Sequence, residues 1–359
     1  MKVVNRYLLK EFVRVLFIVL VSFILIYLVV DFLEKIDNFL EARVPLTRVG
    51  YYYFLSIPNI LFNVAPASVL VSVIITLGLL ARHSEIVALK VGGLSLIRIA
   101  MPFLGMGLLL SFIMFGLSEA VLPVTSQLTN YIWNVEVQKK QDTSSGRYED
   151  VWYKGQGIIS HFRVYDRRAR VIEGVSLYRL NDKFNIYERI EAKEAKWVDG
   201  HWLFFHGKVK TYLDNNNLEI KKFDQAEFEL PELPNDFLSV MRSPEEMDFK
   251  DLYHYARRMS NEGHDPTRYW VDLHLKLSIP IICFIMILIG LPIALWKEKG
   301  GGIALGIGAG IVLSFVYFIF LGLSRSLGYT GLLSPALAAW APNVFFIAFG
   351  SCLFTLVRQ

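Results

Sequence analysis

The chain has only two cysteines among its 359 residues, and it lacks the phosphate-binding motif of the common nucleotide hydrolases. Cys283 and Cys352 both lie in long apolar runs. We therefore expect small packing side chains there and a polar region that folds by burial alone, without a disulfide. The pattern G-x-x-x-x-G-K-[ST] is absent, because the glycine-rich stretch 300–310 is not followed by Lys-Ser or Lys-Thr. The chain itself is not expected to hydrolyse a nucleotide.

Catalytic and metal-binding patterns are also missing. The sequence has no H-E-x-x-H, C-x-x-C or G-x-S-x-G, and its seven histidines show no ligand-like spacing. Acidic residues are absent from the middle of the apolar runs, and Glu119 and Asp272 lie near the ends of two of them. An ion-driven carrier is therefore disfavoured. We expect no catalytic residue, no metal and no cofactor, so the chain is not predicted to be an enzyme.

Long apolar runs dominate what is present. Hydrophobic residues make up 54% of the chain, and the mean hydropathy is +0.41, more than a soluble chain of this length needs. A helix that crosses about 30 Å of hydrocarbon takes about 20 residues. Six segments have this length, near residues 12–32, 53–81, 97–122, 273–296, 303–323 and 334–356. This pattern predicts an α+β membrane protein with six transmembrane helices and a polar domain inserted between helices 3 and 4.

Lysine and arginine predict the orientation. They are in excess at the N-terminus, in the loops after the second and fourth apolar segments and in the C-terminal tail, whereas the opposite loops carry mixed charge. Both termini are therefore expected in the cytoplasm and the insert on the other side of the membrane. The net charge of +4 follows from this topology, so we do not infer nucleic-acid binding from it.

The polar insert alternates apolar and polar residues with a period of two from about 148 to 230. Turn signals interrupt it about every ten residues, at 154–157, 181–182, 199–200 and 214–217. Many short strands at this spacing predict a sandwich, a jelly roll or an open barrel. Helices are expected on either side, at 123–141 and 248–262. The inward aromatic residues either form an ordinary core or belong to a sheet that offers an edge or an apolar groove to a partner.

The loop between the second and third apolar segments predicts a short helix along the membrane face. Ser84 is a candidate N-cap, Ile86 and Leu89 share a face, and Gly92-Gly93 ends the helix. The helix is either a plain connector, or it seats in a groove of a cytoplasmic partner with Glu85 as its charged contact.

This loop resembles a known family. The run L-G-x-L-A-x-x-S-E-x-V at 77–87, followed by glycine, is similar to the coupling helix of the lipopolysaccharide export permeases, the LptF/LptG (YjgP/YjgQ) family. Other matches follow in order along the whole chain: Arg6-Tyr7, Trp152-x-Lys154, and Gly263-His264-Asp265-x-x-Arg268-Tyr269, with Lys276 and Pro280 beyond. Asp31-Phe32-x-Glu34 and the segment 263–269 are more similar to the LptG member than to LptF.

The resemblance implies the permease subunit of an ATP-driven ABC transporter. Such a protein extracts lipopolysaccharide from the bacterial inner membrane and passes it to a periplasmic bridge toward the outer membrane. The implied partners are a homologous LptF-like permease in a heterodimer, a cytoplasmic LptB-like ATPase dimer, and an LptC/LptA-like bridge protein. The alternative is a non-transporting mechanical or signalling subunit that relays cytoplasmic ATP hydrolysis to a periplasmic partner.

The implied organisation has three parts. Residues 1–122 hold transmembrane helices 1–3, with the coupling helix near 83–94 and its contacts at Ser84, Glu85, Ile86 and Leu89. Residues 123–265 form a periplasmic domain that resembles a β-jelly roll, with a core at about 148–230 and flanking helices. Residues 266–359 hold transmembrane helices 4–6.

Glycines mark one face of the fifth apolar segment. Gly302, Gly306 and Gly310 recur every four residues, which lets another helix approach closely. They serve either static packing within the subunit or a sliding gate, since segments one and five line a lipid cavity in the family. We expect Gly306→Leu to block transport without unfolding the protein.

The first apolar segment continues as a helix past the membrane. Phe32, Leu33 and Ile36 lie on its apolar face, and the resemblance implies that they line the same lipid cavity. Lys35 and Arg43 are candidates for the substrate phosphates, or they pair with local acids at i,i+4 spacing.

A second charged group lies at the start of the fourth apolar segment. Asp272 and Lys276 are one helical turn apart there, and they are expected to form a structural pair joined by Arg268.

Overall fold

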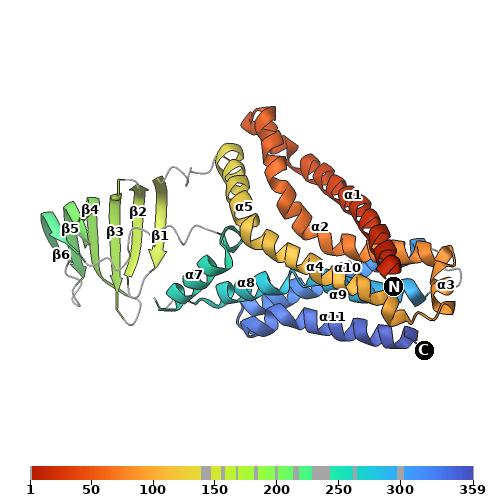
Figure 1. Ribbon diagram of the computed structural model, residues 1–359. Coiled ribbons are helices and arrows are strands. Elements are labelled where there is room, and N and C mark those ends of the chain that lie inside the picture. Colours follow the sequence, from red (N-terminus) through yellow and green to blue (C-terminus); the bar gives the residue numbers. More distant parts are fainter. Residues whose placement is uncertain are drawn as a thin grey trace.

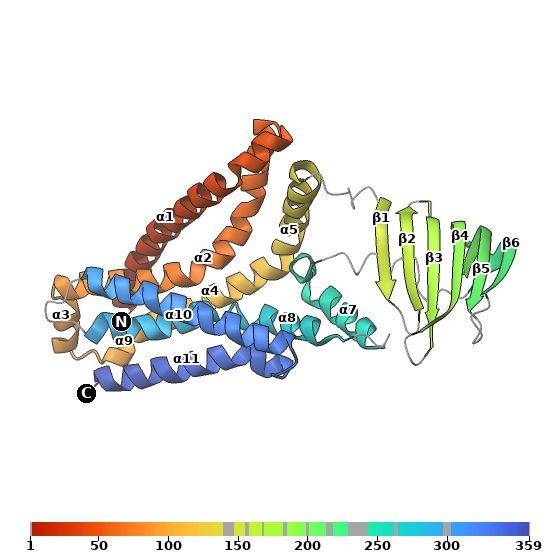
Figure 2. The same ribbon diagram turned by 180° about the vertical axis from the view of Figure 1, so that it is seen from behind.

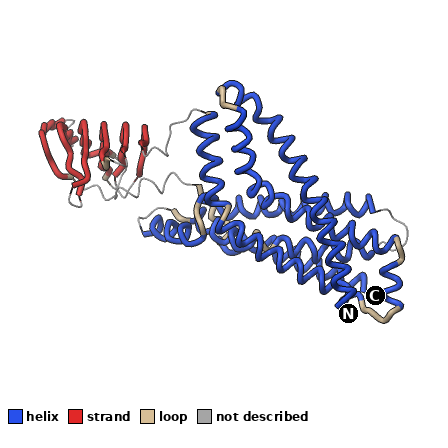
Figure 3. The backbone as a smooth tube through the Cα atoms, turned by 45° about the horizontal axis from the view of Figure 1, so that its top comes forward, coloured by secondary structure: helices blue, strands red, loops and turns tan. Residues whose placement is uncertain are grey.

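The computed structural model describes residues 2–138, 147–154, 158–166, 169–181, 185–198, 201–212, 218–228, 243–261, 265–296 and 303–358. The described helices gather in one bundle, and the described strands form one sheet beyond an end of that bundle (Figure 1, Figure 3). Both termini lie at the opposite end of the bundle, far from the sheet (Figure 2).

The bundle is built from long helices with short helical pieces at their ends. They are α1 (Lys2–Ala42), α2 (Leu46–Arg82), α3 (Glu85–Val91), α4 (Leu96–Ala120), α5 (Leu122–Tyr131), the π-helix η1 (Ile132–Val137), the 3-10 helix η3 (Pro244–Glu246), α7 (Phe249–Asn261), α8 (Thr267–Ser278), α9 (Ile282–Trp296), α10 (Ile303–Tyr329) and α11 (Pro335–Arg358).

Five of the described helices, α1, α2, α4, α10 and α11, are long and apolar enough to cross a membrane. The fourth predicted segment is a bent pair instead, because α8 and α9 meet at an angle of 52°. The count of six spans holds if this pair is one span. The sequence pattern predicts an apolar segment here but not its bend.

The bend between α8 and α9 coincides with a proline and with polar contacts from two other helices. Pro280 has no N–H, so it cannot donate to the carbonyl group one turn earlier. Asn343 of α11 donates its Nδ2 to the carbonyl oxygen of Ser278 at 2.8 Å, and Tyr317 of α10 donates its hydroxyl to Asn343 Oδ1. Both side chains are buried. Because polar groups in a membrane interior need protein partners, these contacts tie three helices together at the bend.

Helices α2 and α9 form the centre of the bundle. Leu70 and Val73 of α2 and Ile285 and Ile289 of α9 are fully buried in one hydrophobic cluster. In the most apolar stretch of α2, 67% of the residues are buried. The other long helices pack around this pair, as Figure 1 shows for α4 and α11.

The insert contains a six-stranded antiparallel sheet. Its strands, in the order of the sheet, are β1 (Arg147–Lys154), β2 (Ile158–Asp166), β3 (Val171–Leu180), β4 (Ile186–Val198), β5 (His201–Tyr212) and β6 (Leu218–Glu227). The predicted strand pattern is therefore confirmed. Each described strand pairs with its neighbour in sequence, whereas a jelly roll has two packed sheets, so the predicted jelly roll is not confirmed.

The inward aromatic residues of the sheet form an ordinary core. Phe162, Tyr165, Trp202 and Phe204 are fully buried in a single cluster, which favours packing over partner binding for these four side chains. The turn residues predicted at 155–157, 182, 199–200 and 214–217 lie outside the described residues.

Candidate functional site

The predicted coupling helix corresponds to α3, a helix of seven residues at the end of the bundle that holds both termini (Figure 2). It ends as predicted: Leu94 N–H donates to the Leu89 carbonyl at 3.1 Å, and Gly93, with φ +85°, donates to the Lys90 carbonyl at 2.9 Å. These two bonds are a Schellman motif. Ser84 occupies the N-cap position, but its backbone is left-handed (φ 59°) and its side chain makes no capping hydrogen bond.

The contact residues predicted on α3 divide between two faces. Ile86 is fully buried and Leu89 half-buried against the core of this same chain, so they hold the helix in place. Val87 and Val91 lie on the open face, with 47% and 84% of their surfaces exposed. Glu85 accepts a hydrogen bond from the Tyr7 hydroxyl at 2.9 Å, which links α3 to the start of α1.

Helices α1 and α10 leave the most apolar surface uncovered. Only 11% of the residues in the most apolar stretch of α1 are buried, and only 17% in α10. The predicted cavity residues of α1 follow this trend: Phe32 and Leu33 are exposed, and Ile36 is half-buried. Both helices pack on α2, where Val71 joins α1 side chains and Ile307 of α10 in one cluster.

The glycine face of α10 is occupied within the chain. A side chain at Gly306 would place its Cβ 3.0 Å from Ile74 Cγ2 of α2, and one at Gly310 would place its Cβ 2.7 Å from Ile74 Cδ1. The two glycines therefore permit close helix packing, which fits the static interpretation. Gly302 lies outside the described residues.

The two phosphate candidates have different surroundings. Lys35 Nζ lies 2.7 Å from Asp31 Oδ1, donates to the Tyr52 hydroxyl at 3.0 Å, and lies 5.2 Å from the Trp133 ring centre. For Lys35, the structure therefore shows the predicted alternative, a local ion pair at i,i+4 spacing with Asp31. Arg43 follows the end of α1 with a left-handed backbone (φ 56°), and its side chain has no ion-pair partner within the described ranges.

The predicted pair of Asp272 and Lys276 is wrong. Asp272, which is buried, pairs with Arg325 of α10 at 2.9 Å and accepts a hydrogen bond from the Tyr329 hydroxyl. Lys276 lies 3.6 Å from Glu119 of α4 instead. Each charge is thus neutralised by an opposite charge on another helix, as ionisable groups inside a helical bundle require. The predicted link through Arg268 is also wrong. The guanidinium of Arg268 lies over the ring of Tyr329 instead, 5.2 Å from the ring centre.

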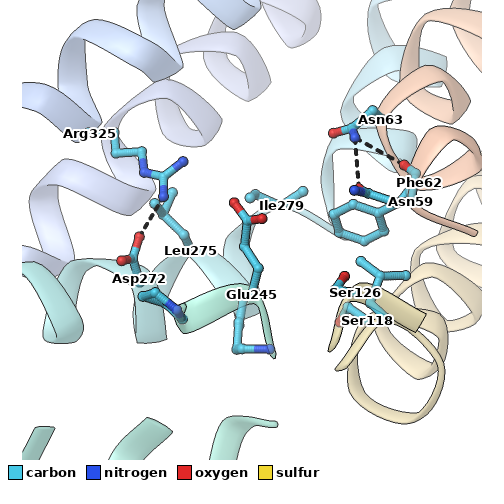
Figure 4. Close-up of a pocket in the computed structure, with 13 residues that line it drawn as sticks. Asn59, Phe62, Asn63, Ser118, Ser126, Glu245, Asp272, Leu275, Ile279 and Arg325 are labelled. Carbon is cyan, nitrogen blue, oxygen red and sulfur yellow. Dashed lines mark hydrogen bonds and ion pairs between the residues drawn. The ribbon is translucent and has the colours of Figure 1, made fainter. Parts of the chain in front are cut away.

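A polar pocket of about 240 Å³ adjoins the Asp272–Arg325 pair. Asn59 and Asn63 of α2 lie on one side of it, Asp272 and Arg325 lie on the other, and Glu245 extends between them (Figure 4). The sequence pattern does not predict this pocket, because its residues come from segments far apart in the chain. The two asparagines within an apolar run were the available signal.

The described residues include no group of three His, Cys, Asp or Glu side chains that could hold a metal ion. The site regions are thus an end helix, two exposed apolar faces and a polar pocket.

Comparison with known proteins identifies the family. Residues 6–356 match the family described as "Lipopolysaccharide export system permease LptF/LptG". The chain is 20% identical over 361 residues to the lipopolysaccharide export system permease protein LptG of Escherichia coli (strain K12), covering 99% of this chain and 98% of that protein. It is 21% identical over 353 residues to LptG of Haemophilus influenzae, covering 96% of this chain and 95% of the relative. Since the family match spans nearly the whole chain, this protein belongs to the LptF/LptG family of lipopolysaccharide export permeases.

Proposed function

We propose that this chain is the LptG-type permease subunit of an ATP-driven exporter, which extracts lipopolysaccharide from the inner membrane and passes it to a periplasmic bridge. Family membership supports the substrate class. The observation that carries the proposal is the uncovered apolar surface of α1 and α10, with 11% and 17% of their most apolar stretches buried. A lipid transporter needs such a surface, because acyl chains bind by apolar contact and shape.

The partner permease and the lipid share this surface in the proposed complex. Helices α1 and α10 both pack on α2 and meet there in one cluster, so a second permease with the same arrangement would enclose a space between two pairs of exposed faces. Phe32, Leu33 and Ile36 would line that space on this chain. A homologous LptF-like subunit is the proposed partner.

The energy source is proposed to bind at α3. This helix lies at the same end of the bundle as both termini (Figure 2), and the excess of Lys and Arg in the short segments of this end favours a cytoplasmic location. The open face of α3 carries Val87 and Val91, and Glu85 is held at its start by Tyr7. A groove in an LptB-like ATPase dimer would receive this face.

The sheet is proposed to lie in the periplasm, at the opposite end. A lipid raised between the helices would leave the membrane at this end and continue along an LptC/LptA-like bridge. The domain boundaries proposed from the sequence are 1–122, 123–265 and 266–359. Along the chain, the sheet therefore comes between the two sets of transmembrane helices.

Charge reversal at Glu85 tests the energy coupling. We expect Glu85→Arg to reduce co-purification of the ATPase and lipopolysaccharide export at least tenfold, because a buried charged contact contributes about 1.5–3 kcal/mol. Tyr7→Phe is the matched control, since it removes the internal hydrogen bond and keeps the Glu85 carboxylate. Normal ATPase binding and normal export in Glu85→Arg would refute the coupling role.

A further inference from the structure

One face of the sheet is hollowed into an open concavity of about 740 Å³. Its lining includes six residues that are basic or can become so, from four strands: His161, Arg163, Lys193, His206, Lys208 and Lys222. Glu191 is the one acidic side chain in the lining. This concavity lies far from the helical site regions along the chain, and it is separate from the exposed apolar faces of α1 and α10.

The backbone shapes this concavity. Gly174 in β3 has φ +67° and His206 in β5 has φ +51°, although both lie within otherwise extended strands. Left-handed residues within strands bend the strand and increase its twist. A side chain at Gly174 would begin 2.8 Å from Arg163 Cβ, so the absence of a side chain there keeps the floor of the concavity open.

The positive charge of the concavity is only partly balanced. In the strand register, Lys208 of β5 lies directly opposite Lys222 of β6, and like charges in this position destabilise a sheet. Glu191 already forms ion pairs with Lys208 at 3.0 Å, Lys210 at 3.4 Å and Arg189 at 2.6 Å. Burial alone would raise the pKa of Glu191, but these three cations outweigh it and hold the pKa below its ordinary value. The carboxylate therefore stays ionised and paired.

Three side chains of the concavity remain available to a ligand. Lys193, His206 and Lys222 are exposed, and none of them has a hydrogen-bond or ion-pair partner among the residues that the structure describes. Lysine ammonium groups bind phosphate as point charges, and charge-assisted hydrogen bonds to phosphate are among the strong ones. The unpaired cations therefore favour a phosphorylated ligand.

An aromatic stack adjoins the concavity through His161, at the end formed by β1 and β2. Trp152 of β1 is 57% exposed, and its ring stacks on His161 with the centroids 4.3 Å apart. Tyr178 of β3 stacks parallel to Trp152 at 6.3 Å. An aromatic face carries partial negative charge and so attracts the C–H face of a sugar ring. An aromatic stack at one end of the concavity and unpaired lysines toward the other are suited to a sugar that carries phosphate.

We propose that this concavity binds a phosphorylated sugar, with the sugar ring against the Trp152–His161 stack at the β1–β2 end and the phosphate directed along the concavity toward Lys193, His206 and Lys222. The assignment of this sugar to the headgroup of the transported lipid rests on the proposed function. The concavity would then hold the polar end of the lipid after it leaves the helices. A free phosphorylated sugar has the same chemistry, and the experiment separates the two sources.

Binding to the full-length protein in neutral-lipid nanodiscs tests the proposal. The probes are glucose 1,6-bisphosphate, inorganic phosphate and glucose, each titrated by calorimetry. The variant Lys193→Gln/Lys222→Gln is expected to bind glucose 1,6-bisphosphate at least tenfold more weakly. The control Lys196→Gln/Lys221→Gln removes the same charge from the same two strands outside the concavity, and it should bind like the parent protein. Trp152→Ala should weaken the bisphosphate severalfold and leave inorganic phosphate unchanged.

Each outcome decides the proposal. Equal binding by the two double variants would overturn the site, and equal affinity for inorganic phosphate and the bisphosphate would overturn its sugar specificity. Purified lipopolysaccharide that competes with the bisphosphate identifies the lipid headgroup as the source, whereas failure to compete assigns the site to a free phosphorylated sugar. Lipopolysaccharide crosslinking from Phe32 of α1 reports the proposed transport separately. A lipopolysaccharide crosslink from Phe32 without binding of the bisphosphate at the concavity would refute the sheet site and leave the proposed transport intact.

Discussion

Helices α1 and α2 are adjacent, and both are strongly apolar, yet their surroundings differ. The most apolar stretch of α1 has a mean hydropathy of 2.9 with 11% of its residues buried, and that of α2 has 2.3 with 67% buried. Hydropathy thus indicates that a helix enters the membrane but not what it contacts there. The more apolar helix is the less covered one, and this difference locates the surface that another molecule must cover.

Helix α10 repeats the pattern of α1. Its most apolar stretch has 17% of its residues buried, against 39% in α4 and 33% in α11. The two least covered helices both pack on α2, where their side chains join one cluster with Val71. A general loss of packing at the edge of the bundle would have affected α4 and α11 equally, so the exposed pair is a specific surface.

Truncation of one leucine on each helix should give the largest difference. Leu70→Ala in α2 removes a fully buried side chain and is expected to lower the free energy of unfolding by about 2–5 kcal/mol, because it leaves a cavity. Leu25→Ala in α1, where the side chain is 56% exposed, should cost less than about 1 kcal/mol. Thermal unfolding of the purified proteins in one detergent measures both, and equal losses would remove the contrast between the helices.

The glycine face of α10 should give an intermediate effect. Gly306→Leu adds a side chain that begins 3.0 Å from Ile74 Cγ2, and overpacking of this kind costs about 1–3 kcal/mol. Gly308→Leu is the control, since no atom lies within 4 Å of its added Cβ, and it should change stability by less than about 0.5 kcal/mol. Thermal unfolding and lipopolysaccharide export are measured for both variants.

A second substitution separates packing from gating at this face. Ile74→Ala in the Gly306→Leu protein makes room for the new side chain and should restore its stability. We expect export to stay blocked in this double variant. Export that returns together with stability would show that the glycines serve static packing only.

The cations near the end of α1 should give the smallest effect on stability. Lys35→Gln removes the contacts with Asp31, Tyr52 and Trp133 and is expected to cost about 1 kcal/mol, whereas Arg43→Gln should be close to neutral. Thermal unfolding of the two variants measures this difference. If Arg43→Gln proved the more destabilising, the assignment of Lys35 to a structural contact would fail.

Much of the fold could be predicted because it depends on local patterns. Run length and hydropathy predicted the apolar segments, a period of two predicted the strands, and Gly92-Gly93 predicted the end of α3. The bend at Pro280 was missed because a proline does not always break an apolar helix, and α2 contains both Pro58 and Pro66 without a break. What differs at the bend is the distant Asn343, which the local pattern does not contain.

Side-chain partners across the bundle could not be predicted for the same reason. Asp272 and Lys276 have the spacing of a helical pair, but Arg325 and Glu119 compete for them from other helices. The burial of Ile86 likewise depends on helices that pack beneath α3. The sequence pattern located the site regions, whereas the choice of partner depends on tertiary packing.

Photocrosslinking from α1 tests the central claim most directly. A photoreactive residue at Leu33, which is 66% exposed, is compared with one at Val73 of α2, which is fully buried, in the assembled complex with an active ATPase. We predict a lipopolysaccharide adduct from position 33 and none from position 73. The absence of an adduct at position 33 would contradict the lipid path along α1 and favour a subunit that only relays ATP hydrolysis.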